Sequence, residues 1–176
     1  PFEAHGFVKA LSFDGDGGVR LLSRLVETEV QRVETWAGRP LYRGAMSNVA
    51  DFKFPDFLLN GLSPGTRSVA QLAVRRWGDR LLATTDNAPW YSLSPSSLQT
   101  LGVETLGGAL RGESRMLAHT KIDSDREILC AAAVDFKVFQ NETMVIFWEF
   151  DKEGKELSKI EYSSPFFIFH DWAITD

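Results

Sequence analysis

The chain has 176 residues, enough for one domain with a sizeable buried core. Hydrophobic residues make up 44% and charged residues 24%, and the thirteen Phe and five Trp favour a strand-rich interior. A net charge of −5, with no basic face in the sequence, argues against nucleic-acid binding.

Cysteine usage bears on the compartment. Cys130 is the only cysteine, so an internal disulfide is excluded and a reducing compartment fits best. Its neighbours Leu129 and Ala131 indicate a buried, unreactive thiol. No apolar run approaches membrane-spanning length. Because the chain starts at Pro1 without a methionine, we expect it to be processed or a fragment.

The chain opens with a predicted β-hairpin. Strands are expected at Phe7–Phe13 and Val19–Val26. The five residues between them, Asp-Gly-Asp-Gly-Gly, tolerate the positive φ that a hairpin turn needs.

A short helix is predicted next. Val30, Val33 and Trp36 recur at helical spacing, which indicates a helix over Glu27–Trp36, and a glycine two residues later supplies a stop. The following stretch, Pro40–Gly65, has no sustained period and is interpreted as a long irregular connection.

Short strands joined by tight turns make up the rest of the chain. The strand over Thr143–Phe150 is largely apolar on both alternating faces, which predicts that it is covered on both sides. The other strands are expected over Val69–Arg76, Arg80–Thr84, Trp90–Leu93, Glu127–Val134, Glu156–Tyr162 and Phe166–Ile174. The pattern predicts an all-β fold with one short helix, and it leaves a sandwich, a barrel and a propeller open.

The chain contains three histidines, His5, His119 and His170. His119 and His170 lie far apart in sequence and form no local metal-binding motif. On the residues alone, the ordinary interpretation is that each histidine is hydrogen-bonded in or near the core.

Five segments, taken in order, resemble motifs of the carotenoid cleavage oxygenases. MLAHTKID around His119 and FHDWAIT around His170 resemble the family's first two histidine motifs, A-H-P-K and H-D-F-x-x-T. The other similar segments are the opening strands GFVKALSF and SRLVET, the stretch RLLA followed by PWYSLSPSSLQTLG, and the hairpin FWEFDKEG. The resemblance covers nearly the whole chain.

The resemblance implies a seven-bladed β-propeller whose axial Fe(II) is held by four histidines from different blades. Residues 1–176 would be the N-terminal portion of that propeller, about two to three blades, incomplete at the C-terminal end. His119 and His170 would be the first two iron ligands, with the other two beyond Asp176, and His5 would be structural.

Asp86 stands where the family has a glutamate that accepts a hydrogen bond from a ligand histidine. An aspartate keeps the charge but is shorter by one methylene, so we expect a loosened or water-bridged contact with the histidine. The alternative is a turn residue ahead of Asn87 and Pro89. Thr120, where the family has proline, and Ser94, where it has aspartate, mark a divergent member.

The resemblance implies an Fe(II)-dependent oxygenase that adds dioxygen across a conjugated double bond of a carotenoid or apocarotenoid, giving carbonyl products. The alternative is a catalytically inactive relative with a binding or structural role in a pigment-containing assembly. Further expected partners are the rest of the propeller, or another protein, on the edge formed by Phe166–Ile174, and a peripheral membrane contact. A plastid or the cytoplasm fits, and a carotenoid substrate favours the plastid.

Overall fold

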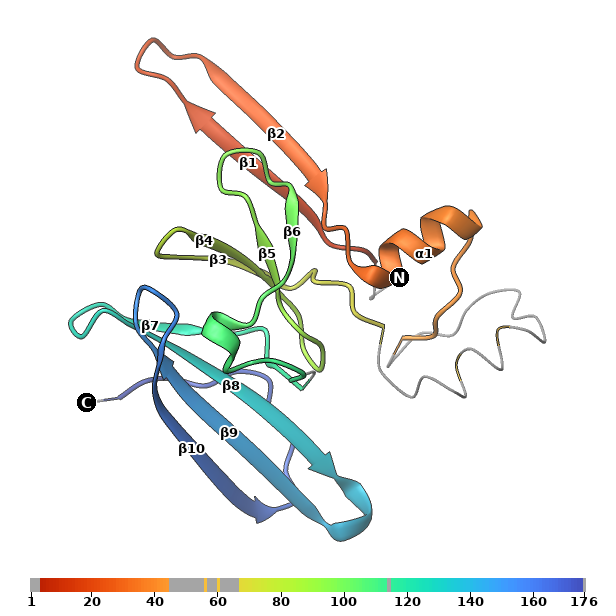
Figure 1. Ribbon diagram of the computed structural model, residues 1–176, viewed down its shortest axis with the longest axis vertical. Coiled ribbons are helices and arrows are strands. Elements are labelled where there is room, and N and C mark those ends of the chain that lie inside the picture. Colours follow the sequence, from red (N-terminus) through yellow and green to blue (C-terminus); the bar gives the residue numbers. More distant parts are fainter. Residues whose placement is uncertain (1–3, 45–55, 57–59, 61–66, 114, 176) are drawn as a thin grey trace.

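The computed structural model describes residues 4–44, 56, 60, 67–113 and 115–175. Two antiparallel sheets lie next to each other, and a two-stranded hairpin projects away from them beside a short helix (Figure 1). The elements are β1 (Phe7–Phe13), β2 (Val19–Leu25), α1 (Glu29–Ala37), β3 (Ala73–Trp77), β4 (Arg80–Thr84), β5 (Tyr91–Leu93), β6 (Thr100–Val103), η1 (Leu106–Gly108), β7 (Lys121–Asp123), β8 (Ile128–Lys137), η2 (Val138–Gln140), β9 (Glu142–Phe150) and β10 (Glu156–Pro165).

Each of the two sheets is a four-stranded meander. Their strand orders are β3-β4-β5-β6 and β10-β9-β8-β7, and all neighbouring strands are antiparallel. A four-stranded antiparallel meander is the blade of a β-propeller, so the predicted all-β class and propeller architecture are confirmed, with sheets that do not close into a circle. The described residues contain no helix long and apolar enough to span a bilayer.

The largest apolar cluster joins the two blades. Leu82 and Trp90 come from the first blade, whereas Leu129 and Phe150 come from the second, and all four are almost completely buried. On β9, Ile146, Trp148 and Phe150 enter this cluster, while Val145 and Phe147 belong to a second cluster on the opposite face of the sheet. The prediction that this strand is covered on both sides is therefore confirmed.

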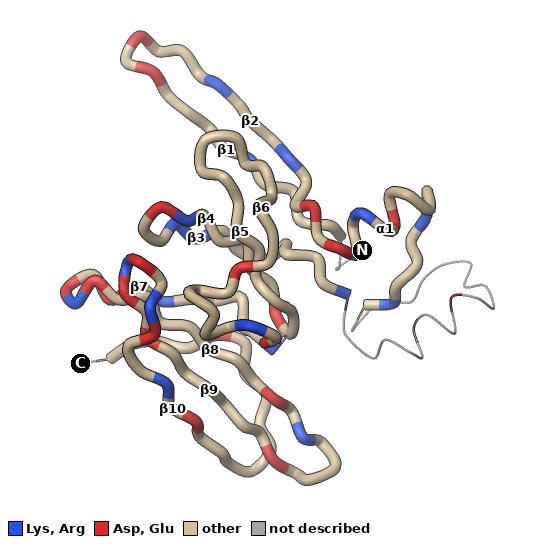
Figure 2. The backbone as a smooth tube through the Cα atoms, in the orientation of Figure 1, with Lys and Arg blue, Asp and Glu red and all other residues tan. Residues whose placement is uncertain are grey.

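The two blades are also connected where their hairpin turns meet. The Trp77 indole donates to the Asp151 carbonyl oxygen at 2.7 Å, and the Arg80 guanidinium donates to the Glu153 carbonyl oxygen at 2.8 Å. A Cβ at Gly78 would lie 2.5 Å from the Lys152 carbonyl oxygen, so only glycine fits there without a shift. Charged residues of both signs line these turns (Figure 2).

The predicted strand over Phe166–Ile174 is wrong. This segment forms no strand and turns back along the second blade, where the Thr143 hydroxyl contacts both the backbone N–H and the carbonyl of Phe167. Trp172 packs edge-on against Phe147, with 5.5 Å between ring centroids. Phe169 and Trp172 are partly buried against the face of the second blade, whereas Ile168 is 74% exposed, so this apolar run reflects partial packing on a sheet face and not pairing with a strand. The short strands β6 and β7 were not predicted as strands, because three or four residues are too few for a visible alternation.

The helix α1 forms where it was predicted, but the side of the helix that is buried differs from the predicted one. Thr28 caps it by accepting a hydrogen bond from the Gln31 N–H, and Gly38 ends it in the left-handed conformation. Trp36, expected on the apolar face, is 89% exposed, whereas the polar residues Gln31 and Glu34 are buried. Helical spacing of apolar residues could not predict this, because a polar network holds the buried side. Most of the predicted irregular connection, Pro40–Gly65, lies outside the described residues.

The cap supports a first prediction. Thr28→Ala removes the side-chain acceptor for the Gln31 N–H and the hydroxyl that donates to the Ser68 carbonyl oxygen. We expect the free energy of unfolding to fall by about 1 kcal/mol, the usual effect of losing an N-cap. Thr28→Ser keeps both hydrogen bonds and is the control in denaturant titrations. Equal stability of the alanine and serine variants would contradict the assigned cap.

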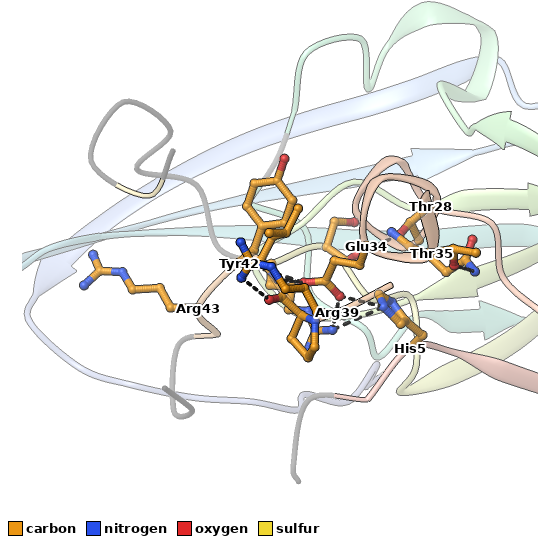
Figure 3. A network of polar contacts seen from close by, with 12 residues as sticks. His5, Thr28, Glu34, Thr35, Arg39, Tyr42 and Arg43 are labelled. Carbon is orange, nitrogen blue, oxygen red and sulfur yellow. Dashed lines mark hydrogen bonds and ion pairs between the residues drawn. The ribbon is translucent and has the colours of Figure 1, made fainter. Parts of the chain in front are cut away.

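The network on the buried side of α1 centres on Glu34 (Figure 3). Its carboxylate pairs with Arg67, accepts from His5 Nε2 at 2.8 Å, and accepts from the backbone N–H groups of Leu41 and Tyr42. Burial alone would raise the pKa of Glu34, but the backbone donors and Arg67 outweigh it and hold this pKa below its ordinary value. Burial, aided by the charge of Arg67, lowers the pKa of His5.

These two pKa shifts predict acid sensitivity. Both groups bind protons less readily in the folded than in the unfolded state, so the unfolded state takes up more protons as pH falls. For His5 the loss of stability begins as pH falls through its ordinary pKa of 6.5, and for Glu34 through 4.5. Denaturant titrations between pH 7 and pH 5 should show that the free energy of unfolding falls less steeply in His5→Gln than in the wild type. Parallel curves for the two proteins would contradict this.

Candidate metal centre

The three residues predicted from the sequence, Asp86, His119 and His170, meet at the junction of the two blades. Asp86 follows β4, His119 precedes β7, and His170 lies in the segment after β10. The Nε2 atoms of His119 and His170 are 2.9 Å apart, and the two rings are nearly perpendicular, with an interplanar angle of 85°. The Nε2 atoms of both imidazoles therefore point toward one common position.

Asp86 contacts both histidine-bearing segments. Its Oδ2 lies 2.6 Å from Nδ1 of His170, and its Oδ1 accepts from the Ala118 backbone N–H at 2.7 Å. The contact with His170 is direct, so the shorter aspartate side chain reaches the ring without the water bridge that the sequence suggested. With Nδ1 donating to a carboxylate, a neutral His170 carries its lone pair on Nε2. This is the tautomer in which Nε2 can bind a metal.

A second contact ties the two segments together. Lys121 Nζ lies 2.7 Å from Oδ1 of Asp171, and the same oxygen accepts from the Trp172 N–H at 2.8 Å. Lys121 is two residues after His119 and Asp171 directly follows His170. The pair therefore links the two histidine-bearing segments close to the histidines in sequence. Sequence reasoning missed it, although the signal was present: both residues belong to the two quoted histidine motifs.

The two imidazoles suit a divalent transition metal. Imidazole nitrogens bind such ions at about 2.0–2.1 Å, so two ligands at right angles on one ion lie about 2.9 Å apart, as the two Nε2 atoms do here. No group of three or more His, Cys, Asp or Glu side chains able to hold a metal occurs among the described residues. The described residues thus offer two imidazole nitrogens to one ion, without a third His, Cys, Asp or Glu side chain grouped with them.

His5 does not join this site. It lies in the Glu34 network beside α1, where its Nε2 contacts Glu34 and Arg67. Cys130 is also separate: it is buried on β8, and burial raises the pKa of its thiol, which keeps it in the unreactive protonated form.

Two blade-like meanders, with paired histidines and an aspartate at their junction, define a β-propeller protein with a candidate metal centre. The chain belongs to the retinal pigment epithelial membrane protein family, whose model matches residues 1–176.

Relatives of this family are similar along the whole chain. It is 33% identical to the apocarotenoid-15,15'-oxygenase of Synechocystis sp., covering 99% of this chain and 36% of the relative. It is 27% identical to the chloroplastic carotenoid cleavage dioxygenase 7 of Oryza sativa subsp. japonica, covering 100% of this chain and 36% of the relative. The chain therefore spans about a third of the length of these relatives.

Solved structures share the arrangement of the blades. The cobalt-substituted apocarotenoid oxygenase of Synechocystis superimposes with a TM-score of 0.84 at 32% identity, over 99% of this chain and 37% of that one. A chimera of that oxygenase and the retinal pigment epithelial protein superimposes with a TM-score of 0.83, at the same identity and coverage.

Proposed function

We propose that this chain is the N-terminal portion of an Fe(II)-dependent oxygenase that cleaves a conjugated double bond of a carotenoid or apocarotenoid with dioxygen, giving two carbonyl products. The observation that carries the proposal is the convergence of His119 Nε2 and His170 Nε2, with Asp86 on the other nitrogen of His170. The names of the relatives, which are apocarotenoid and carotenoid cleavage oxygenases, support the substrate class.

The roles of the residues follow from their contacts. His119 and His170 would hold two positions on the metal through neutral nitrogens, which leave its charge uncancelled. When bound, Fe(II) supplies the activation of dioxygen that the cleavage needs. Asp86 fixes the tautomer and the ring orientation of His170, and the Lys121–Asp171 pair links the two segments that carry the histidines. The rest of the full-length protein would supply the other two histidines and the remaining blades.

The setting of the protein is part of the same proposal. The plant relatives from rice and Arabidopsis thaliana are named chloroplastic, which supports a plastid over the cytoplasm. The remaining blades, or a partner protein, would cover the segment Phe166–Ile174. A carotenoid substrate resides in membranes, so a peripheral membrane contact would give the protein access to it.

The test uses the full-length protein. We expect about one iron per protein after anaerobic loading with Fe(II), and loss of the visible absorption of an apocarotenoid once oxygen is admitted. Both carbonyl products should be found by chromatography, with label from ¹⁸O₂. Iron binding and carotenoid binding without cleavage would favour the inactive pigment-binding alternative. Cleavage by the metal-free protein, or no metal binding at all, would overturn the proposal.

A further inference from the structure

The backbone that leads into His119 is bonded throughout to the first blade. The Asn87 N–H donates to the Met116 carbonyl oxygen at 2.8 Å, and the Trp90 indole N–H donates to the Leu117 carbonyl oxygen at 3.1 Å. The Thr84 hydroxyl donates to the Ala118 carbonyl oxygen at 2.9 Å. Met116, Leu117 and Ala118 are each at most 2% exposed.

The second blade holds two of these three residues, Met116 and Leu117, from the other side. The Leu117 N–H donates to the Ala132 carbonyl oxygen at 2.8 Å, and Met116 forms a bridge with Ala133. With the Ala118 N–H on Asp86, every polar backbone group from the Leu117 N–H to the Ala118 carbonyl has a partner. The backbone that precedes His119 is therefore fixed by both blades. The His119 imidazole needs no further side-chain contact to hold it in place.

The two histidines are positioned in different ways. His170 lies on a segment without regular structure, its side chain is 60% exposed, and its polar partners among the described residues are the side chains of Asp86 and His119. His119 depends on the buried residues Thr84 and Trp90, which are 0% and 1% exposed. The hydrogen bonds of both side chains go to backbone carbonyls and, among the described residues, not to an imidazole.

We propose that Thr84 and Trp90 are positioning residues for the metal centre, setting the direction of the His119 imidazole through the Leu117 and Ala118 carbonyls. This inference rests on the proposed metal-binding role of His119. Loss of either donor leaves a buried carbonyl unpaired, and the backbone relieves this by turning the peptide that precedes His119. A small rotation there moves Nε2 away from its meeting point with His170.

Two substitutions test this in the full-length protein, of which Thr84→Val is near-isosteric and Trp90→Phe also removes one ring of a buried side chain. Thr84→Val removes the hydroxyl and keeps the side-chain shape, and Trp90→Phe removes the indole N–H. Each should weaken Co(II) binding about 10-fold, as loss of a supporting hydrogen bond around a metal ligand does, and should shift the visible absorption bands of bound Co(II). Thr84→Ser keeps the donor and should restore both the affinity and the spectrum.

Trp77→Phe is the matched control. Trp77 is a buried tryptophan of the same apolar cluster, and its indole donates to a backbone carbonyl, that of Asp151, at the opposite end of the β3–β4 hairpin from Thr84. It should lose comparable thermal stability and keep the Co(II) affinity and spectrum of the wild type. Equal Co(II) binding by the Trp77 and Trp90 variants, or by Thr84→Val and Thr84→Ser, would overturn the inference and leave the proposed function standing. Failure of the wild type to bind Co(II) would instead overturn the proposed function. If Trp90→Phe does not fold, the Thr84 pair decides.

Discussion

His170→Ala is expected to abolish tight metal binding in the full-length protein and, with it, carotenoid cleavage. The substitution removes one of two nitrogens that lie 2.9 Å apart and leaves the Asp86 carboxylate without its imidazole partner. The loss of metal affinity should exceed the about 10–100-fold that follows when only a supporting partner of a ligand is removed. Metal content after gel filtration and the rate of apocarotenoid bleaching measure the two effects.

His5→Ala is the matched control for this variant. It removes the same side chain from a histidine that contacts Glu34 and Arg67 and has no contact with His119 or His170 among the described residues. We expect it to lower stability while metal content and cleavage remain those of the wild type. If His170→Ala retained stoichiometric iron, or if His5→Ala lost it, the assignment of the centre would be wrong.

Asp86→Ala is expected to reduce metal affinity by about 10–100-fold. One carboxylate serves two donors, the Nδ1–H of His170 and the N–H of Ala118, and alanine leaves both without an acceptor. His170 would then be free to adopt the tautomer with its proton on Nε2, in which Nε2 has no lone pair to offer a metal. Isothermal titration with Co(II) measures the change in affinity, and thermal melting measures the change in stability.

Two further substitutions at Asp86 separate charge from shape. In Asp86→Asn only one of the two terminal atoms accepts hydrogen bonds, so a single donor keeps its partner and the metal affinity should fall between those of wild type and Asp86→Ala. Asp86→Glu introduces the glutamate that the carotenoid cleavage oxygenases have at this position. We expect this variant to bind metal as tightly as the wild type does. Unchanged affinity in Asp86→Ala would reduce Asp86 to a turn residue.

The sequence predicted the elements whose side chains alternate or recur over enough residues. The strands Phe7–Phe13 and Arg80–Thr84 were predicted with the bounds that the structure has. The strand predicted over Phe166–Ile174 was wrong, because a run of apolar residues does not distinguish pairing with a strand from partial packing of a few side chains on a sheet face. The predicted buried face of α1 was wrong as well, because Glu34 is paired with His5 and Arg67 from distant parts of the chain and with backbone donors just after the helix.

For the candidate site, the resemblance identified Asp86, His119 and His170, and the structure supplied their geometry. Spacing in sequence carries no information on a 2.9 Å approach between residues on either side of a whole blade. The contributions of Thr84 and Trp90 were invisible for a related reason. Their partners are backbone carbonyls, and any residue type at positions 117 and 118 presents the same acceptor.

The contact between the hairpin turns of the two blades has a consequence for hydrogen exchange. Because the shared apolar cluster and the bonds from Trp77 and Arg80 join the blades, neither sheet can open without breaking the other's contacts. Slowly exchanging amides of β4, β8 and β9 should therefore exchange as one cooperative unit. The β1–β2 hairpin projects away from both blades and should exchange faster (Figure 1). The backbone that carries His119 is bonded to both blades and would then open only when that whole unit opens.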